Sequence, residues 1–196
     1  MRVNGMKGQN EMLGMKAAAS DGKPNSKAMD RAIRAAAEGD RDALRLLYLE
    51  GGRAVYAYAL SMLKSPQDAE DVLHDCFLRA WEHAADYQSQ GKPMAWLLTI
   101  TRNLCLSRLR ERKRIGILPD DHAELPAPQG LSPEERLALD ATLSALSARD
   151  RQIVVLHAVA GLKHREIAAM LDMPLGTVLS QYRRALKKLQ TALEQE

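Results

Sequence analysis

The stretch HREIAAMLDMPLGTVLSQYRRALKKL, residues 164–189, contains two helical patterns separated by a short turn. Ile167, Met170 and Leu171 lie on one face of the first pattern, and DMP interrupts it. The second pattern has its own apolar face at helical spacing: Val178, Tyr182, Ala185 and Leu189. Two short helices with a tight turn between them, the second ending in basic residues, predict a helix-turn-helix.

The outward face of the second helix carries polar and basic side chains. At about 100° per residue, four residues fall opposite the apolar face: Gly176, Ser180, Arg183 and Lys187. This position suits Ser180 and Arg183 for base edges in a major groove. One flank carries Thr177, Gln181, Arg184 and Lys188, and the other carries Leu179. Phosphate contacts are expected from Arg184 and Lys188, with Thr177 near the helix N-terminus. A solvated basic face on an ordinary helix is the alternative.

An earlier segment, SPQDAEDVLHDCFLRAWEHA at residues 65–84, begins with a cap and a proline, which predict the start of a helix. Its apolar residues form one stripe: Ala69, Leu73, Cys76, Phe77, Ala80 and Ala84. Its acids fall on the opposite side: Asp68, Asp71, Asp75 and Glu82. The acidic side is either a solvated surface or a docking face for a basic partner.

The next segment, PMAWLLTITRNLCLSRLRERKR at residues 93–114, has the opposite charge. Its apolar face is formed by four residues: Trp96, Ile100, Leu104 and Leu109. Arginines surround this face, which favours a surface for phosphates or a single strand. The preceding loop YQSQGKP, residues 87–93, is polar and suits a pocket for an unstacked base. An ordinary surface helix and loop remain the alternative.

The whole chain of 196 residues predicts an all-α fold, because aromatic residues make up only 4% and helical periodicity dominates. We expect a disordered tail at 1–28, a helical domain at 29–114, a flexible acidic linker at 115–132 and a helix-turn-helix domain at 133–196. The net charge is +3, and no apolar run has the ~20 residues that a membrane span needs. Cys76 and Cys105 fall among apolar neighbours, which favours buried thiols in a cytoplasmic protein.

Three motifs in order carry a family resemblance: DAEDVLHDCFLRAW, WLLTITRNLCLSRLRERKR, and LSARDRQIVVL followed by GLKHREIAAMLDMPLGTVLSQYRRALKKL. From about Asp40 to its end, the chain resembles a bacterial extracytoplasmic-function (group IV) sigma factor of the sigma-70 family. The resemblance implies promoter-specific initiation by RNA polymerase. The partners it implies are the β′ coiled coil and β subunit of core polymerase, promoter DNA and an anti-sigma factor. It implies no cofactor, metal, small-molecule substrate or direct membrane insertion.

The resemblance also assigns roles to individual residues. Core-polymerase contacts are implied for Asp68, Asp71, Val72 and Asp75. Contacts with the single strand of the −10 element are implied for Tyr87, Gln88, Lys92, Trp96, Arg102, Asn103, Arg108 and Arg110. Contacts with the −35 element are implied for Arg149, Arg165, Thr177, Leu179, Ser180, Arg183, Arg184 and Lys187. Leu179 and Gln181 stand where the family commonly has basic residues, which implies a salt dependence flatter by about 0.9 slope units for each phosphate that is no longer bound.

Three other functions compete with this interpretation. A sigma-like decoy would bind polymerase or an anti-sigma factor without initiating transcription. An ordinary helix-turn-helix regulator would explain the C-terminal part but not the acidic helix. An enzyme is not expected, because His74 and Cys76 point to different sides of a helix and the sequence contains no phosphate-binding loop or nucleophile elbow.

Overall fold

A computed structural model describes residues 24–115 and 146–193, and within these ranges the regular elements are all helices. The first group comprises α1 (Ser26–Ala37), α2 (Arg41–Leu63), α3 (Pro66–Glu82), the short 3₁₀ helix η1 (Ala84–Asp86) and α4 (Pro93–Ile115). The second comprises α6 (Ala148–Val154), the π-helical turn η2 (Val155–Val159), α7 (His164–Leu171) and α8 (Leu175–Leu193). The predicted all-α fold is confirmed.

Polar caps determine where several helices begin. The Ser65 hydroxyl accepts from the Asp68 amide at 3.3 Å, and Pro66 follows at the first helical position. Ser147 caps α6 in the same way, accepting from the Asp150 amide at 3.2 Å. Asn25 caps α1, so this helix begins within the predicted disordered tail rather than after it. The predicted linker at 115–132 lies outside the described residues except for Ile115.

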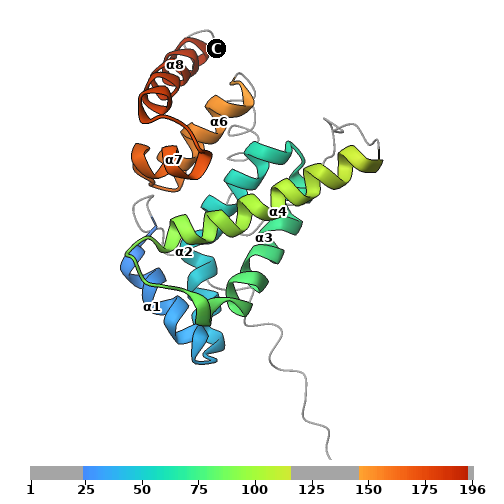
Figure 1. The fold of residues 1–196 in the computed structure, drawn as a ribbon, viewed down its shortest axis with the longest axis vertical. Coiled ribbons are helices and arrows are strands. Elements are labelled where there is room, and N and C mark those ends of the chain that lie inside the picture. The colour runs from blue at the N-terminus through green and yellow to red at the C-terminus, as the bar shows by residue number, and fades with distance from the viewer. Residues whose placement is uncertain (1–23, 116–145, 194–196) are drawn as a thin grey trace, which may run out of the picture.

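Helix α2 is the centre of the structure. It packs against α1, α3 and α4 of the first group and against α6 and η2 of the second (Figure 1). Seven consecutive residues of α2, 54–60, are buried, as expected for a helix covered all round. At Gly51 a Cβ atom would lie 2.7 Å from a Leu97 methyl group, so the absent side chain lets α4 approach α2 closely.

The C-terminal helices complete the predicted helix-turn-helix. Asp172, with a left-handed φ of 53°, ends α7, and α8 begins at Leu175 after a short turn. Val178 and Ala185 are fully buried and Tyr182 is half-buried, which confirms the predicted inward face of α8. Among the described helices, none has both the length and the apolar character needed to cross a bilayer.

Candidate functional site

Helix α3 presents the predicted acidic face. The side chains of Asp71 and Asp75 are 53% and 46% exposed, whereas that of Asp68 is only 18% exposed. Opposite them, all six residues of the predicted apolar stripe are buried. Val72 is also fully buried, so it packs in the hydrophobic core and does not belong to this surface. Its contact with a partner stays a prediction, and in this conformation the side chain is covered.

Arg108 of α4 lies against the acidic face of α3. Its guanidinium reaches the carboxylates of Asp71 at 3.0 Å, Asp75 at 3.2 Å and Asp68 at 3.6 Å. Arg112 forms a further ion pair with Asp68. The aspartates predicted to contact polymerase and the arginine predicted to contact the −10 strand thus form one ion-pair network. To hold a DNA phosphate, Arg108 would have to leave these carboxylates.

The loop before α4 is held at several points. The Tyr87 ring lies 5.0 Å from the Trp96 ring, centroid to centroid, and its hydroxyl donates a hydrogen bond to Asp30 of α1 at 2.8 Å. Gly91 has a left-handed φ of 68°, which a side chain would strain. Gln88 and Lys92 are exposed, so the loop offers polar groups to a ligand while its tyrosine is anchored.

The remaining predicted −10 residues follow along α4. Asn103 and Arg110 are exposed and Arg102 is half-buried. Burial raises the pKa of the Tyr58 phenol to about 12, and the positive charges of Arg102 and Arg149 oppose this rise. Arg102 comes from α4 and has a predicted −10 role, and Arg149 comes from α6 and has a predicted −35 role. Both therefore lie close enough to Tyr58 to affect the pKa of its phenol.

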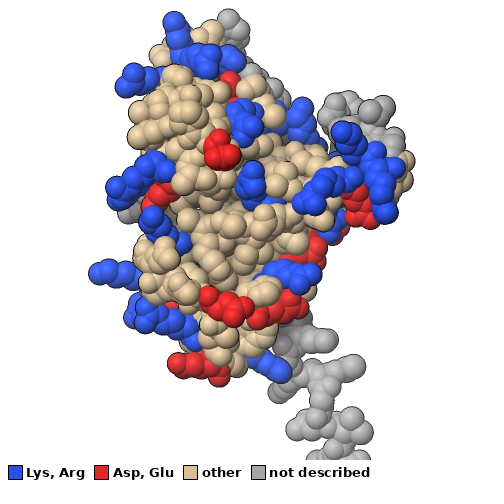
Figure 2. All heavy atoms as spheres, viewed as in Figure 1, with Lys and Arg blue, Asp and Glu red and all other residues tan. Residues whose placement is uncertain are grey.

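Helix α8 displays the predicted basic face. Ser180, Arg183, Arg184 and Lys187 are exposed, whereas Thr177 and Leu179 are half-buried. The Ser180 hydroxyl donates to the Thr177 carbonyl at 2.9 Å, so its oxygen is left to accept from a ligand. The other two predicted −35 residues, Arg149 and Arg165, are exposed on α6 and α7. Figure 2 shows Lys and Arg gathered over the α8 end and over the C-terminal end of α4.

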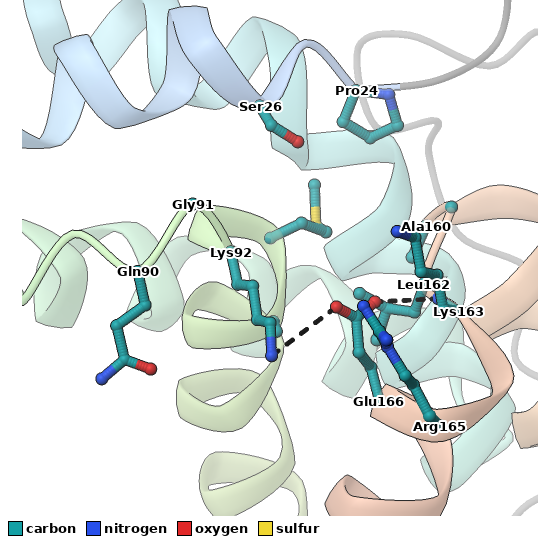
Figure 3. A pocket seen from close by; sticks show the side chains of 13 residues that line it. Pro24, Ser26, Gln90, Gly91, Lys92, Ala160, Leu162, Lys163, Arg165 and Glu166 are labelled. Atoms are coloured by element: carbon teal, nitrogen blue, oxygen red, sulfur yellow. Dashed lines mark hydrogen bonds and ion pairs between the residues drawn. The ribbon is translucent and has the colours of Figure 1, made fainter.

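A cleft of about 440 Å³ separates the loop before α4 from the start of α7 (Figure 3). Lys92 on one wall approaches Glu166 on the other, with 3.8 Å between its ammonium and the carboxylate. Glu166 also accepts from the Lys163 amide at 2.9 Å, which caps α7. Arg165 lines the same cleft. Lys92 and Arg165, with predicted −10 and −35 roles, therefore face one shared space.

Two histidines and a tyrosine, one each from η2, α7 and α8, form a cluster of rings. The His157 and His164 rings stack at 4.2 Å, and each meets the Tyr182 ring at 4.8 Å. Burial, and secondarily the nearby His157, lowers the pKa of His164. Protonation of His164 is therefore less favourable in the folded protein than in the unfolded chain.

This cluster predicts a pH-dependent stability. Since the folded pKa of His164 lies below the ordinary value of about 6.5, its contribution is fully present above that pH and is lost as the pH falls towards the folded pKa. The melting temperature should fall between pH 8 and pH 5.5, and His164→Gln should reduce this fall. Calorimetry at both pH values measures it. An identical fall in both proteins would show that His164 does not contribute.

Sequence patterns missed Asp30 and Glu166, and they gave Ser89 no role beyond its place in the predicted loop. Asp30 binds Tyr87 and Ser89 across 57 and 59 positions, a separation at which no periodicity gives a signal. Glu166 was recognisable only as an acid near a helix start. Within residues 24–115 and 146–193, no group of His, Cys, Asp and Glu side chains is arranged to hold a metal ion.

Comparison with protein families gives two matches in chain order. The model described as Sigma-70 region 2 matches residues 47–115. The model described as Sigma-70, region 4 matches residues 136–189. The first covers α3, α4 and most of α2, and the second includes α6 through most of α8.

Similar proteins bear names of the same kind. The chain is 36% identical to the ECF RNA polymerase sigma factor SigE of Mycolicibacterium smegmatis over 147 residues, which are 71% of this chain and 57% of that relative. It therefore spans little more than half the length of that protein. It is 28% identical to SigL of Mycobacterium tuberculosis, over 83% of this chain and 96% of the relative.

Solved structures agree with these matches. CnrH, in complex with the cytosolic domain of CnrY, shares 26% identity and a TM-score of 0.58, covering 86% of this chain and 99% of that one. The sigma factor RpoE of Bartonella quintana, solved with the anti-sigma factor NepR, shares 29% identity and a TM-score of 0.58, covering 72% and 90%. With both family regions in order on an all-helical fold, the chain belongs to the sigma-70 family and, like its relatives, to the ECF sigma factors.

Proposed function

We propose that this protein binds core RNA polymerase and directs initiation at promoters whose −35 and −10 elements it reads. The observation that supports the proposal is that one chain exposes an acidic surface and, separately, a basic surface. The acidic face of α3 exposes Asp71 and Asp75, and the helix-turn-helix exposes Arg183 and Arg184 on α8. The acidic face of α3 is not needed by a regulator that only binds DNA.

The acidic face of α3 is the proposed polymerase contact. Its exposed carboxylates suit a basic partner such as the coiled coil of the β′ subunit. In the free protein Arg108 shields Asp71 and Asp75, so a partner arginine would compete with it. Exposed ion pairs are worth only about 0–1 kcal/mol, so this competition would cost little. Release from these pairs would also leave Arg108 free for the strand-backbone role that the family resemblance implies.

The loop at 87–92 and the adjoining part of α4 form the proposed −10 contact. The exposed Gln88 and Lys92 can reach an unstacked base and its phosphate, and Trp96 offers a partly exposed ring. Arg102, Asn103 and Arg110 then follow the strand along α4. The loop ends within one helical turn of Trp96. The residues proposed to capture the base and those proposed to contact the strand backbone therefore adjoin one another.

The −35 contact predicts a specific loss in Arg183→Ala. If Arg183 meets a base edge, its removal should weaken binding to the cognate element by about 1–3 kcal/mol and relax base preference at one position. Arg184→Ala should instead weaken all sequences alike and reduce the salt slope by about one unit, since one phosphate is then left without its cation. Fluorescence anisotropy at several salt concentrations measures both. Unchanged affinity and preference in Arg183→Ala would place base reading elsewhere.

Promoter binding requires the two parts of the molecule to separate. Elements centred about 25 base pairs apart, at about 3.4 Å per pair, lie roughly 80 Å from one another. In the described residues Lys92 and Glu166 instead form an ion pair across the shared cleft. We therefore propose a free form in which α6 and η2 rest on α2, and a polymerase-bound form in which they have moved away from α2.

Four further assignments belong to this proposal. The domains follow the predicted division, with the first extended to begin at α1. The protein works in the cytoplasm, where polymerase and promoters are found. It carries out no catalysis itself. An anti-sigma factor is its proposed regulator, because two structurally similar proteins were solved as complexes, one of them a sigma factor with a protein named as an anti-sigma factor.

Reconstitution tests the proposal against the decoy alternative. Sigma-free core polymerase and promoter-bearing DNA should yield transcripts only when this protein is added. Stable binding to core without transcripts would favour a decoy, for which the non-basic Leu179 and Gln181 on α8 are the supporting feature. Absence of binding to core would overturn the proposed role of α3.

A further inference from the structure

Asp30 of α1 binds three side chains, and two of them belong to the proposed −10 loop. Its Oδ1 accepts from the Tyr87 hydroxyl at 2.8 Å. The Ser89 hydroxyl lies 2.7 Å from Oδ1 and 2.8 Å from Oδ2, so it donates to the same carboxylate. Arg34, one turn further along α1, reaches Oδ2 at 3.0 Å. One carboxylate therefore joins α1 to two alternate residues of the loop.

These contacts are built to hold the loop. The Asp30 side chain is only 18% exposed, and the hydrogen bonds from Ser89 and then Tyr87 lower its pKa, so it is a carboxylate at neutral pH. Hydrogen bonds to an ionised acceptor are about twice as strong as neutral ones. The Tyr87 ring is in addition fixed against Trp96. Between the two anchored residues, Gln88 is exposed.

We infer that Asp30 is a positioning residue for promoter reading: it fixes residues 87–89 so that Gln88 and its neighbours meet an unstacked −10 base in one geometry. The inference rests on the proposed function, because it names a determinant of the same loop. The Asp30 carboxylate is turned towards the loop's hydroxyl groups, so the role that we infer for it needs no contact with DNA. Without it, the loop keeps its sequence but loses the connection to α1.

The test measures base preference in the assembled holoenzyme. The probes are fluorescent single-stranded oligonucleotides that carry the −10 non-template sequence of a promoter mapped with this protein. Four versions differ only in the base at the position with the strongest preference. Binding is titrated for the wild type, Asp30→Ala, Asp30→Asn, the double variant Tyr87→Phe/Ser89→Ala and Arg34→Ala.

The wild type should discriminate among the four bases. Asp30→Ala should lower the discrimination at least about fivefold, because a mobile loop no longer favours one geometry. The double variant should show the same loss, and combining it with Asp30→Ala should add nothing. Arg34→Ala is the matched control, since it removes an exposed partner of the same carboxylate but leaves the hydrogen bonds to the loop, and it should discriminate normally.

Each outcome is decisive. Normal discrimination by Asp30→Ala and Asp30→Asn, with a discriminating wild type, overturns the positioning role. No discrimination by the wild type overturns the proposed −10 function, and the positioning role with it. A merely structural effect would lower the melting temperature or core affinity and leave the ratio between bases unchanged. Asp30→Asn keeps the size of the side chain, so it gives a folded variant if Asp30→Ala does not.

Discussion

Asp71→Arg together with Asp75→Arg will abolish binding to core polymerase while the protein stays folded. Both side chains are exposed and lie away from the core, and each exchange places a positive charge where the partner is proposed to be basic. Breaking a charge pair in an interface typically costs about 2–5 kcal/mol, so two reversals should lower the affinity by at least about a hundredfold. Titration of labelled polymerase measures the affinity, and circular dichroism measures the helical content.

The control is Glu82→Arg. Glu82 lies two turns beyond Asp75 at the end of the same acidic side, is exposed and pairs with Arg79 at 3.3 Å. It is not among the four residues for which a polymerase contact is implied. It receives the same kind of charge reversal, so nonspecific repulsion would affect it too. Affinity near the wild-type value for Glu82→Arg supports a local contact. Wild-type affinity in the double variant would show that the carboxylates of α3 do not bind polymerase.

Phe77→Ala should destabilise the first group of helices by about 3–5 kcal/mol. Phe77, the only phenylalanine in the chain, is 4% exposed and packs 5.0 Å from the Tyr48 ring of α2, centroid to centroid. The substitution leaves a cavity between α2 and α3 in the core that supports the acidic face. A large share of the roughly 5–15 kcal/mol stability of an ordinary protein would be lost. Urea unfolding followed by circular dichroism measures the change.

The neighbouring Leu78→Ala is the matched control. Leu78 is 60% exposed on the same helix, so its truncation should change the stability by less than about 0.5 kcal/mol. We expect both Phe77→Ala and the double aspartate variant to bind polymerase poorly. In Phe77→Ala the core that supports the acidic face is destabilised, whereas in the double variant the exposed charges are reversed. Only Phe77→Ala should unfold at lower urea concentration. Equal stability of the two truncation variants would contradict the assignment of Phe77 to the core.

Local chemistry made most of the fold predictable. Ser65 and Ser147 precede helix starts and accept the amide hydrogen bonds that such residues usually accept. The turn between α7 and α8 was recognisable from its proline and from the change in apolar phase. The start of α1 was predicted too late, because the glycine- and lysine-rich tail hid a short signal. Asn25 caps the helix, and Ala28 and Met29 are buried.

Contacts between distant elements were not predictable. The pairing of Arg108 with Asp71 and Asp75 depends on how α4 is placed against α3, which helical periodicity alone does not specify. Val72 was assigned to the acidic surface by resemblance, although its neighbour Leu73 belongs to the buried stripe. Helical periodicity likewise could not predict that Asp30 contacts the loop at 87–92.

One stretch of the sequence agrees with the arrangement that the structure shows, although it was not used to predict it. The run AVYAYAL at residues 54–60 is apolar all round, which a helix covered on a single side does not require. In the structure α2 contacts α1, α3 and α4 and also α6 and η2. The sequence left open whether the free protein is closed or extended, and this run favours the closed form.

The most direct measurement is the mapping of RNA 5′ ends after transcription by sigma-free core polymerase, with this protein, on a library of genomic fragments. We predict discrete starts that share two upstream motifs, near −35 and −10. We also predict that Arg183→Ala changes the preference only at the first motif. Starts that match those of core polymerase alone, in a mixture where the protein binds core, would contradict promoter-specific initiation by this chain.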